Sequence, residues 1–201
     1  MKNLFKISSK LHRALPLGFL LLLPSLAQAH PGMLGHIHGF ANGLTHPLTG
    51  LDHICAMIAV GLWAAQRGGR ACWFIPLVFV SVMSIGGMLG LAGIQIPFAE
   101  VGIIASVLIL GVLVAAAVRL PLAVSSLIVG TFALFHGFAH GAEMPETASG
   151  LNYAWGFMFA TACLHLCGVG LGLLAKEFAP EKTLRWTGGA IAACGLYLCL
   201  V

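Results

Sequence analysis

The amino-acid sequence predicts an all-α membrane protein, a compact bundle of about six transmembrane helices that follows a cleaved signal peptide. Three observations carry this prediction. Of the 201 residues, 59% are hydrophobic and only 8% are charged, whereas soluble domains carry roughly 25% charged residues. Beyond the leader, six apolar segments are long enough, or nearly so, to cross the roughly 30 Å hydrocarbon core of a bilayer. The leader itself has the three parts of an export signal.

That leader comprises residues 1–29. A basic region runs to Arg13, an apolar stretch spans Leu15–Leu26, and Ala27-Gln28-Ala29 has the small-x-small pattern of a cleavage site. The alternative is an uncleaved first transmembrane helix, but the apolar stretch is short and contains two prolines. Cleavage leaves residues 30–201 as one transmembrane domain that begins with a histidine.

The six apolar segments are separated by short polar or glycine-containing breaks. Small residues four apart recur in them, as at Gly86 and Gly90, and such spacing lets membrane helices approach closely. The last segment is barely long enough and has Arg185 near its start. The predicted spans are Thr45–Gln66, Ala71–Ala92, Val101–Val118, Leu122–His140, Tyr153–Ala175 and Leu184–Val201.

The basic residues indicate how the bundle is oriented. Four of the ten Lys and Arg residues precede the first apolar run, and the other six balance six acidic residues, so nothing favours a nucleic-acid partner. Those six lie in the loops after odd-numbered spans or at the start of the last span. The positive-inside rule places these loops in the cytoplasm and the mature N-terminus outside, in agreement with the export signal. The six are Arg67, Arg70, Arg119, Lys176, Lys182 and Arg185.

Ionisable side chains at membrane depth are costly and are therefore functional candidates. In this chain most of them are histidines, and the acids of the outer half accompany them. Imidazole and carboxylate together suit nickel, cobalt, zinc, copper or iron better than calcium or magnesium. The pattern therefore indicates handling of a transition metal or of protons. The candidate metal ligands are His30, His36, His38, His46, Asp52, His53, Glu100, His136, His140, Glu143 and His165.

Spacing groups these candidates. His136, His140 and Glu143 are at i, i+4 and i+7, which places them on one face of a helix. His46 and His53 share a face if their helix begins at Pro47, a favourable first-turn residue. Asp52 is expected either to be a ligand or to accept a hydrogen bond from an imidazole N–H.

Other candidates lie outside these two groups. A terminal His30 offers an α-amine and an imidazole, and with His36 or His38 it is expected to capture a metal ion outside the membrane. His165 lies near the middle of the fifth span, where it is a transit ligand, a proton acceptor or a packing residue. The six cysteines lie in apolar runs and are interpreted as packing residues; Cys163 and Cys167 flank His165 and leave a soft metal site as the alternative.

These residues also carry a resemblance. His46-Pro-Leu-Thr-Gly-Leu-Asp52-His53 resembles the His-x5-Asp-His signature of the HupE/UreJ family of nickel/cobalt permeases. Phe135-His136-Gly-Phe-Ala-His140-Gly-Ala-Glu143 resembles the second signature of that family. The likeness covers essentially the whole mature chain. It implies uptake of nickel or cobalt across a bacterial inner membrane, for hydrogenase, urease or cobalamin biosynthesis. It also implies that the ligands in both motifs matter for transport, with Glu100 as a further member.

The function predicted is thus a secondary permease rather than an enzyme, with no resident cofactor and with Ni²⁺ or Co²⁺ as cargo. No Walker motif is present, so the membrane potential or proton coupling is expected to drive transport. The oligomeric state stays open. The alternatives are an accessory protein or sensor that binds metal without transporting it, a membrane metalloenzyme, and a bis-histidine haem protein. A zinc protease is disfavoured because the sequence has no His-Glu-x-x-His.

Overall fold

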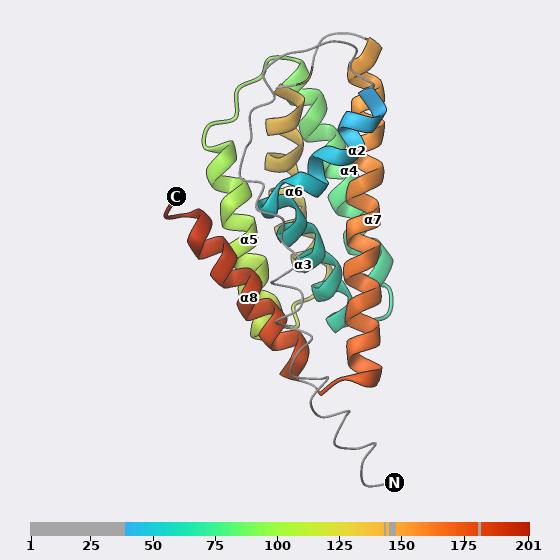
Figure 1. Cartoon of the computed structure of the whole chain (residues 1–201), viewed down its shortest axis with the longest axis vertical. Coiled ribbons are helices and arrows are strands. Elements are labelled where there is room, and N and C mark those ends of the chain that lie inside the picture. Colours follow the sequence, from blue (N-terminus) through green and yellow to red (C-terminus); the bar gives the residue numbers. More distant parts are fainter. Residues whose placement is uncertain (1–38, 143, 145–147, 181) are drawn as a thin grey trace, which may run out of the picture.

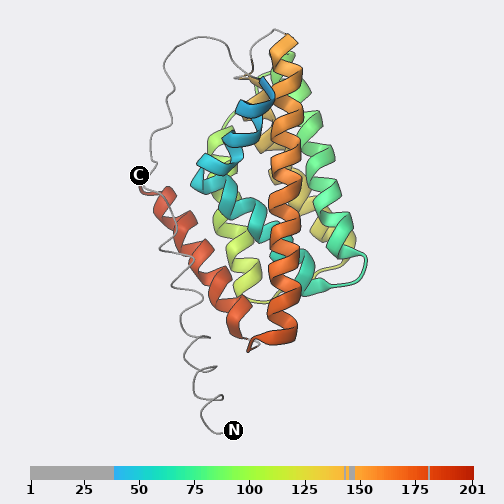
Figure 2. The same cartoon turned by 45° about the vertical axis from the view of Figure 1, so that its right-hand side comes forward.

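Every regular element that the computed structural model describes is an α-helix. The described residues are 39–142, 144, 148–180 and 182–201, so the predicted signal peptide lies outside them. Figures 1 and 2 show the helices side by side in one bundle. They are α2 Gly39–Thr49, α3 Leu51–Arg67, α4 Ala71–Leu91, α5 Ala99–Ala115, α6 Leu122–Ala142, α7 Ala148–Phe178 and α8 Lys182–Leu198.

Several of these helices have the length and composition of membrane spans. α4, α6 and residues Gly150–Phe178 of α7 are long and apolar enough to cross a bilayer. α2 and α3 pass the same test together, although they are bent by 79° at the break between them. α5 is a shorter apolar helix, and α8 has 17 residues. The prediction of an all-α, multi-pass membrane protein is confirmed, while six crossings and the signal peptide stay predictions.

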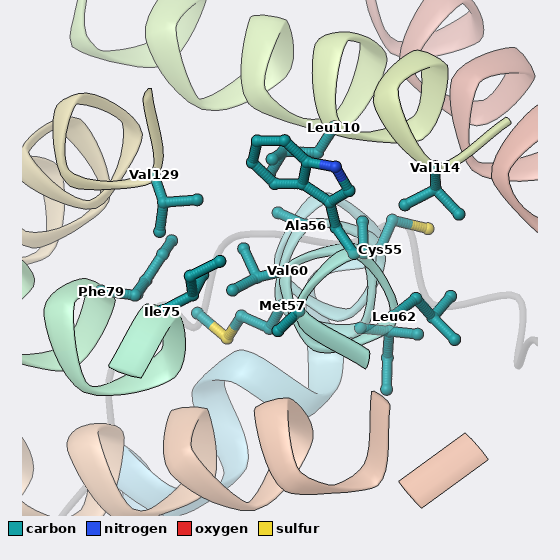
Figure 3. Close-up of a cluster of buried hydrophobic side chains, with 14 of the residues drawn as sticks. Cys55, Ala56, Met57, Val60, Leu62, Ile75, Phe79, Leu110, Val114 and Val129 are labelled. Atoms are coloured by element: carbon teal, nitrogen blue, oxygen red, sulfur yellow. The ribbon is translucent and has the colours of Figure 1, made fainter. Parts of the chain in front are cut away.

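α3 is the central helix of the bundle, in contact with α4, α5, α7 and α8. Figure 3 shows its apolar side chains pointing toward the surrounding helices. Met57 and Val60 are fully buried, and Phe79 of α4 and Leu110 of α5 close the core around them. The Trp63 indole N–H donates to the Val118 carbonyl at 2.9 Å, which satisfies the polar atom of the largest buried side chain.

Glycines let two helix pairs pack with their backbones in contact. A Cβ atom on Gly137 of α6 would collide with the Met83 carbonyl of α4, and one on Gly90 of α4 would collide with the Phe138 carbonyl of α6. On the other side of α3, a Cβ on Gly61 would collide with the His165 carbonyl of α7. These small residues confirm the close helix packing predicted from their spacing.

The basic residues gather at one end of the bundle, as predicted. The loops between α3 and α4, between α5 and α6, and between α7 and α8 all lie at the lower end in Figure 1. There the Lys176 ammonium donates to the Ala65 carbonyl at 2.7 Å, and Arg185 Nε donates to the Ala115 carbonyl at 2.9 Å. Both carbonyls belong to the last turns of helices, where cations are favoured by the helix dipole. The clustering agrees with the predicted pattern of loops, while the cytoplasmic placement of that end stays a prediction.

Candidate metal site

The candidate site lies where α2 ends and α3 begins. The prediction of one helix over Thr45–Gln66, starting at Pro47, is wrong. Pro47 lies inside α2, and the chain leaves the helix at Gly50, whose φ of −88° and ψ of 121° are those of extended backbone. Proline lacks the N–H that a continuous helix needs, and glycine weakens a helix further, so the break has a local cause. His46 thereby lies on one helix and His53 on the other.

This break brings three imidazoles from three helices together. His46 of α2, His53 of α3 and His140 of α6 each offer a ring nitrogen, and these nitrogens all lie within 4.8 Å of one another. The Nε2 atoms of His53 and His140 are 2.5 Å apart. Two neutral ring nitrogens this close share a hydrogen, and a cation could replace that hydrogen as their common partner if the rings moved slightly apart. Within the described part of the chain, these three histidines form the cluster of three or more converging ligands that could hold a metal ion.

Asp52 is hydrogen-bonded to His53. Its Oδ1 atom accepts a hydrogen bond from the His53 ring at Nδ1 (2.8 Å) and from the His53 backbone N–H (2.8 Å). A carboxylate can only accept, so Nδ1 carries the hydrogen, and a neutral ring then has its lone pair on Nε2, which faces His140 Nε2. Metal-binding histidines commonly have such a carboxylate partner. The structure thus shows Asp52 as a hydrogen-bond acceptor for His53, and its role as an orienting residue stays a prediction.

His136 lies one helical turn before His140 on α6, and its ring is held in the same tautomer as that of His53. Its Nδ1 lies 2.9 Å from the Phe132 carbonyl, which can only accept, so Nδ1 carries the hydrogen here as well. Nε2 has no hydrogen-bond partner among the residues that the structure describes. The ring is fully buried, and its centroid is 5.4 Å from that of His53. His136 therefore extends the histidine cluster toward the interior of the bundle.

Aromatic and thioether side chains surround the cluster. The Phe157 ring of α7 lies against His46, His53 and His140, with centroid distances of 5.9, 6.1 and 4.7 Å. An apolar cavity of about 250 Å³ between α4, α6 and α7 reaches His140, and its lining includes Met83 and Met158. Such walls lower the local dielectric, so they strengthen the interaction of a cation with its ligands.

Among the other predicted ligands that the structure describes, Glu100 and His165 lie outside this cluster. Glu100 lies exposed in the first turn of α5. His165 is fully buried on α7, whereas the flanking Cys163 and Cys167 are exposed, so these three do not converge. This disfavours the alternative of a soft metal site there, and the packing interpretation fits Cys55, which is buried. Three predicted histidines and one predicted acid lie outside the described residues: His30, His36, His38 and Glu143.

Two residues that shape the candidate site, Gly50 and Phe157, were not predicted from the sequence. Gly50 was treated as part of a continuous helix, although a glycine that closely follows Pro47 is a typical helix-breaking signal. Phe157 carries no such signal, because an aromatic residue in an apolar segment is ordinarily a packing residue. The helix break therefore had a signal in the sequence, whereas the aromatic wall became visible only in three dimensions.

Fold and site together define a helical, multi-pass membrane protein with a partly buried cluster of histidines at a broken helix. The chain belongs to the HupE/UreJ family, whose model, described as "HupE / UreJ protein", matches residues 18–198. It is similar to Protein HupE of Rhizobium leguminosarum bv. viciae, with 47% identity over 178 residues, which are 89% of this chain and 92% of that protein. No solved structure matches. The predicted family resemblance is confirmed.

Proposed function

We propose that the protein is a permease that imports a divalent transition metal, nickel or cobalt, across a bacterial inner membrane. The observation that carries the proposal is the convergence of His46, His53 and His140 at a break between two helices. Transporters bind their substrates near discontinuous helices of this kind. Membership of the HupE/UreJ family, together with the metal uptake that the resemblance implies, supports the same function.

The chemistry of the cluster suits this cargo. Neutral imidazole is a ligand that nickel, cobalt, zinc and copper prefer, whereas calcium and magnesium prefer oxygen ligands. The ring nitrogens replace water molecules that the ion loses when it enters the bundle. Asp52 places a negative charge beside the site, which partly offsets the charge of the cation in a low-dielectric surrounding.

The direction of transport follows from the membrane potential. In the proposed orientation the cationic end of the bundle faces the cytoplasm, so an ion at the cluster enters from the periplasm. An inside-negative potential favours inward movement of a divalent cation by about 4.6 kcal/mol per 100 mV, which is twice the value for a single charge. The potential alone is thus a sufficient driving force in this proposal.

The test is accumulation of radioactive nickel in cells that lack their own nickel importers, at limiting supply and with cobalt as competitor. Expression of the protein is expected to raise cellular nickel, and the competition ranks the two metals. A correctly inserted protein that binds nickel but leaves its accumulation unchanged would favour the accessory or sensor role. Absence of both binding and uptake for either metal would contradict the proposal.

Replacing Asp52 with asparagine is expected to weaken nickel binding roughly 10–100-fold, as is typical when the partner of a metal-binding histidine is changed. Asparagine keeps a carbonyl oxygen near His53 Nδ1 but removes the negative charge that favours the cation. Equilibrium dialysis of the purified protein against nickel measures the change. An affinity equal to that of the unmodified protein would mean that Asp52 does not act on the site.

Replacing Gly50 with alanine tests the helix break. A Cβ atom there would lie 2.7 Å from Asp52 Oδ1 and 2.8 Å from His53 Nδ1, so the hydrogen-bonded pair must move. Nickel affinity is expected to fall about tenfold or more, since displacing a ligand's partner resembles losing it. Gly170→Ala is the matched control, because a Cβ at Gly170 of α7 meets open space. Equal affinities in the two variants would contradict the role assigned to Gly50.

A further inference from the structure

His165 is a buried histidine that the cluster does not use. It lies on α7 with no exposed surface, and neither Nδ1 nor Nε2 has a hydrogen-bond partner within the ranges that the structure covers. A neutral imidazole has one donor and one acceptor. Most buried polar groups are paired, so an unpaired one calls for an explanation such as an ion or a functional role. In a membrane-spanning segment that expectation is stronger still.

The position of His165 in the bundle indicates the functional role of its unpaired nitrogens. A series of rings in edge contact connects it to the cluster: His53 to His136 at 5.4 Å, His136 to Phe79 at 5.5 Å, and Phe79 to His165 at 4.7 Å between centroids. The Phe79 ring therefore contacts both His136 and His165. Both histidines carry unpaired ring nitrogens, and they come from different helices, α6 and α7.

The position of His165 along α7 is consistent with this series of ring contacts. Phe157 marks the level of the cluster, and His165 follows eight residues later, which is about 12 Å at 1.5 Å per residue. Lys176, which bonds the Ala65 carbonyl at the cationic end, is a further eleven residues or about 16 Å away. His165 is thus an intermediate position between the cluster and the end of the bundle that is proposed to face the cytoplasm.

The hydroxyl and thioether groups beside His165 are weak ligands for a divalent cation. Gly61 and Gly168 bring the backbones of α3 and α7 into contact there, and Thr161, one turn before His165, is fully buried beside Met83. Thr161 Oγ1 lies 3.9 Å from the Met83 sulfur. Hydroxyl and thioether groups are weaker ligands for nickel or cobalt than an imidazole nitrogen, so His165 would be the main ligand in this layer.

We propose that His165 is an inner metal-binding position, which takes over the divalent cation from His136 on its way from the cluster toward the cytoplasmic end. The inference rests on the proposed transport function and assigns a second, deeper site within it. His136 binds through Nε2, whose lone pair is free, and His165 binds through whichever ring nitrogen lacks the hydrogen. Two positions of moderate affinity allow the ion to leave the cluster without becoming fully unliganded.

Three variants test the inner site by uptake. His165→Leu removes the ligand with a similar volume, and His165→Met restores a thioether ligand that cannot carry a proton. Thr161→Val is the matched control, because it changes a buried polar residue on the same helix without removing a strong ligand. For His165→Leu, the maximal uptake rate is expected to fall about tenfold or more with the half-saturating nickel concentration little changed. His165→Met is expected to recover part of that rate, and Thr161→Val to transport normally.

Three different results would contradict the inner metal site. Normal uptake by His165→Leu would make His165 a packing residue, and equal loss in the Leu and Met variants would make it a proton acceptor; either result overturns the inner metal site. Loss of high-affinity nickel binding in His165→Leu would show that the change disturbs the cluster instead, and would equally count against it.

A binding measurement separates this inference from the transport function. Equilibrium dialysis of the purified protein with radioactive nickel is expected to reveal a tighter and a weaker class of bound ion, with only the weaker class missing in His165→Leu. If the unmodified protein does not accumulate nickel in cells but shows this pattern, the transport function fails and the inner site stands. A single class, unchanged in His165→Leu, would refute the inner site whatever the uptake result.

Discussion

Replacing His53 with alanine is expected to abolish nickel uptake and to weaken nickel binding by more than about 100-fold, since even changing a partner of a ligand costs roughly 10–100-fold. His53 is the histidine that connects the whole site. Its Nε2 faces that of His140, its Nδ1 is held by Asp52, and its ring contacts that of His136. No other residue makes all of these contacts, so its loss removes a ligand and also releases the groups around it.

The measurement compares radioactive nickel accumulation with nickel affinity of the purified variant. Met57→Ala is the matched control, because Met57 is fully buried one turn further along α3 and offers no ring nitrogen. Shortening this side chain leaves a cavity, so stability is expected to fall by about 2–5 kcal/mol, as for other Met→Ala changes in protein cores. Its nickel affinity should stay close to that of the unmodified protein. Uptake by His53→Ala at the normal rate would exclude the cluster as the transport site.

Sequence reasoning predicted the helices well because the bilayer imposes a simple requirement on them. A segment that crosses hydrocarbon must be apolar over a sufficient length and must satisfy its own backbone hydrogen bonds. Ala71–Ala92 and Leu122–His140 were therefore placed within two residues of α4 and α6. The clustering of basic residues at one end followed from an equally general rule, which acts on the loops between spans.

The site itself was only partly predictable. Histidines and acids were recognised as candidates because polar groups are costly in a membrane, but their mutual geometry depends on helix packing. His46 and His53 were expected on one face of a single helix, whereas the break at Gly50 places them on two helices that bend toward each other. The separation of His165 from the cluster by Phe79 depends on side-chain directions on three helices. No local pattern in the sequence encodes such an arrangement.

Replacing Gly137 with alanine is expected to lower the free energy of unfolding by about 1–3 kcal/mol, the usual cost of overpacking a well-filled contact. Gly137 lies on α6 between His136 and His140, and an added Cβ would collide with the Met83 carbonyl and approach the Gly87 backbone of α4. Because the obstacle is backbone rather than a flexible side chain, α6 as a whole must move away from α4.

This displacement should affect function as well as stability, because α6 supplies both His136 and His140 to the histidine cluster. Uptake is expected to fall together with the unfolding free energy, which denaturant titration of the purified protein in detergent measures. Gly130→Ala is the matched control on the same helix. A Cβ at Gly130 would lie 3.7 Å from side-chain atoms of Val78 and Val82, an ordinary contact, and alanine favours the helix. If Gly137→Ala matched Gly130→Ala in stability and uptake, close packing of α4 on α6 would not be what holds these two histidines in place.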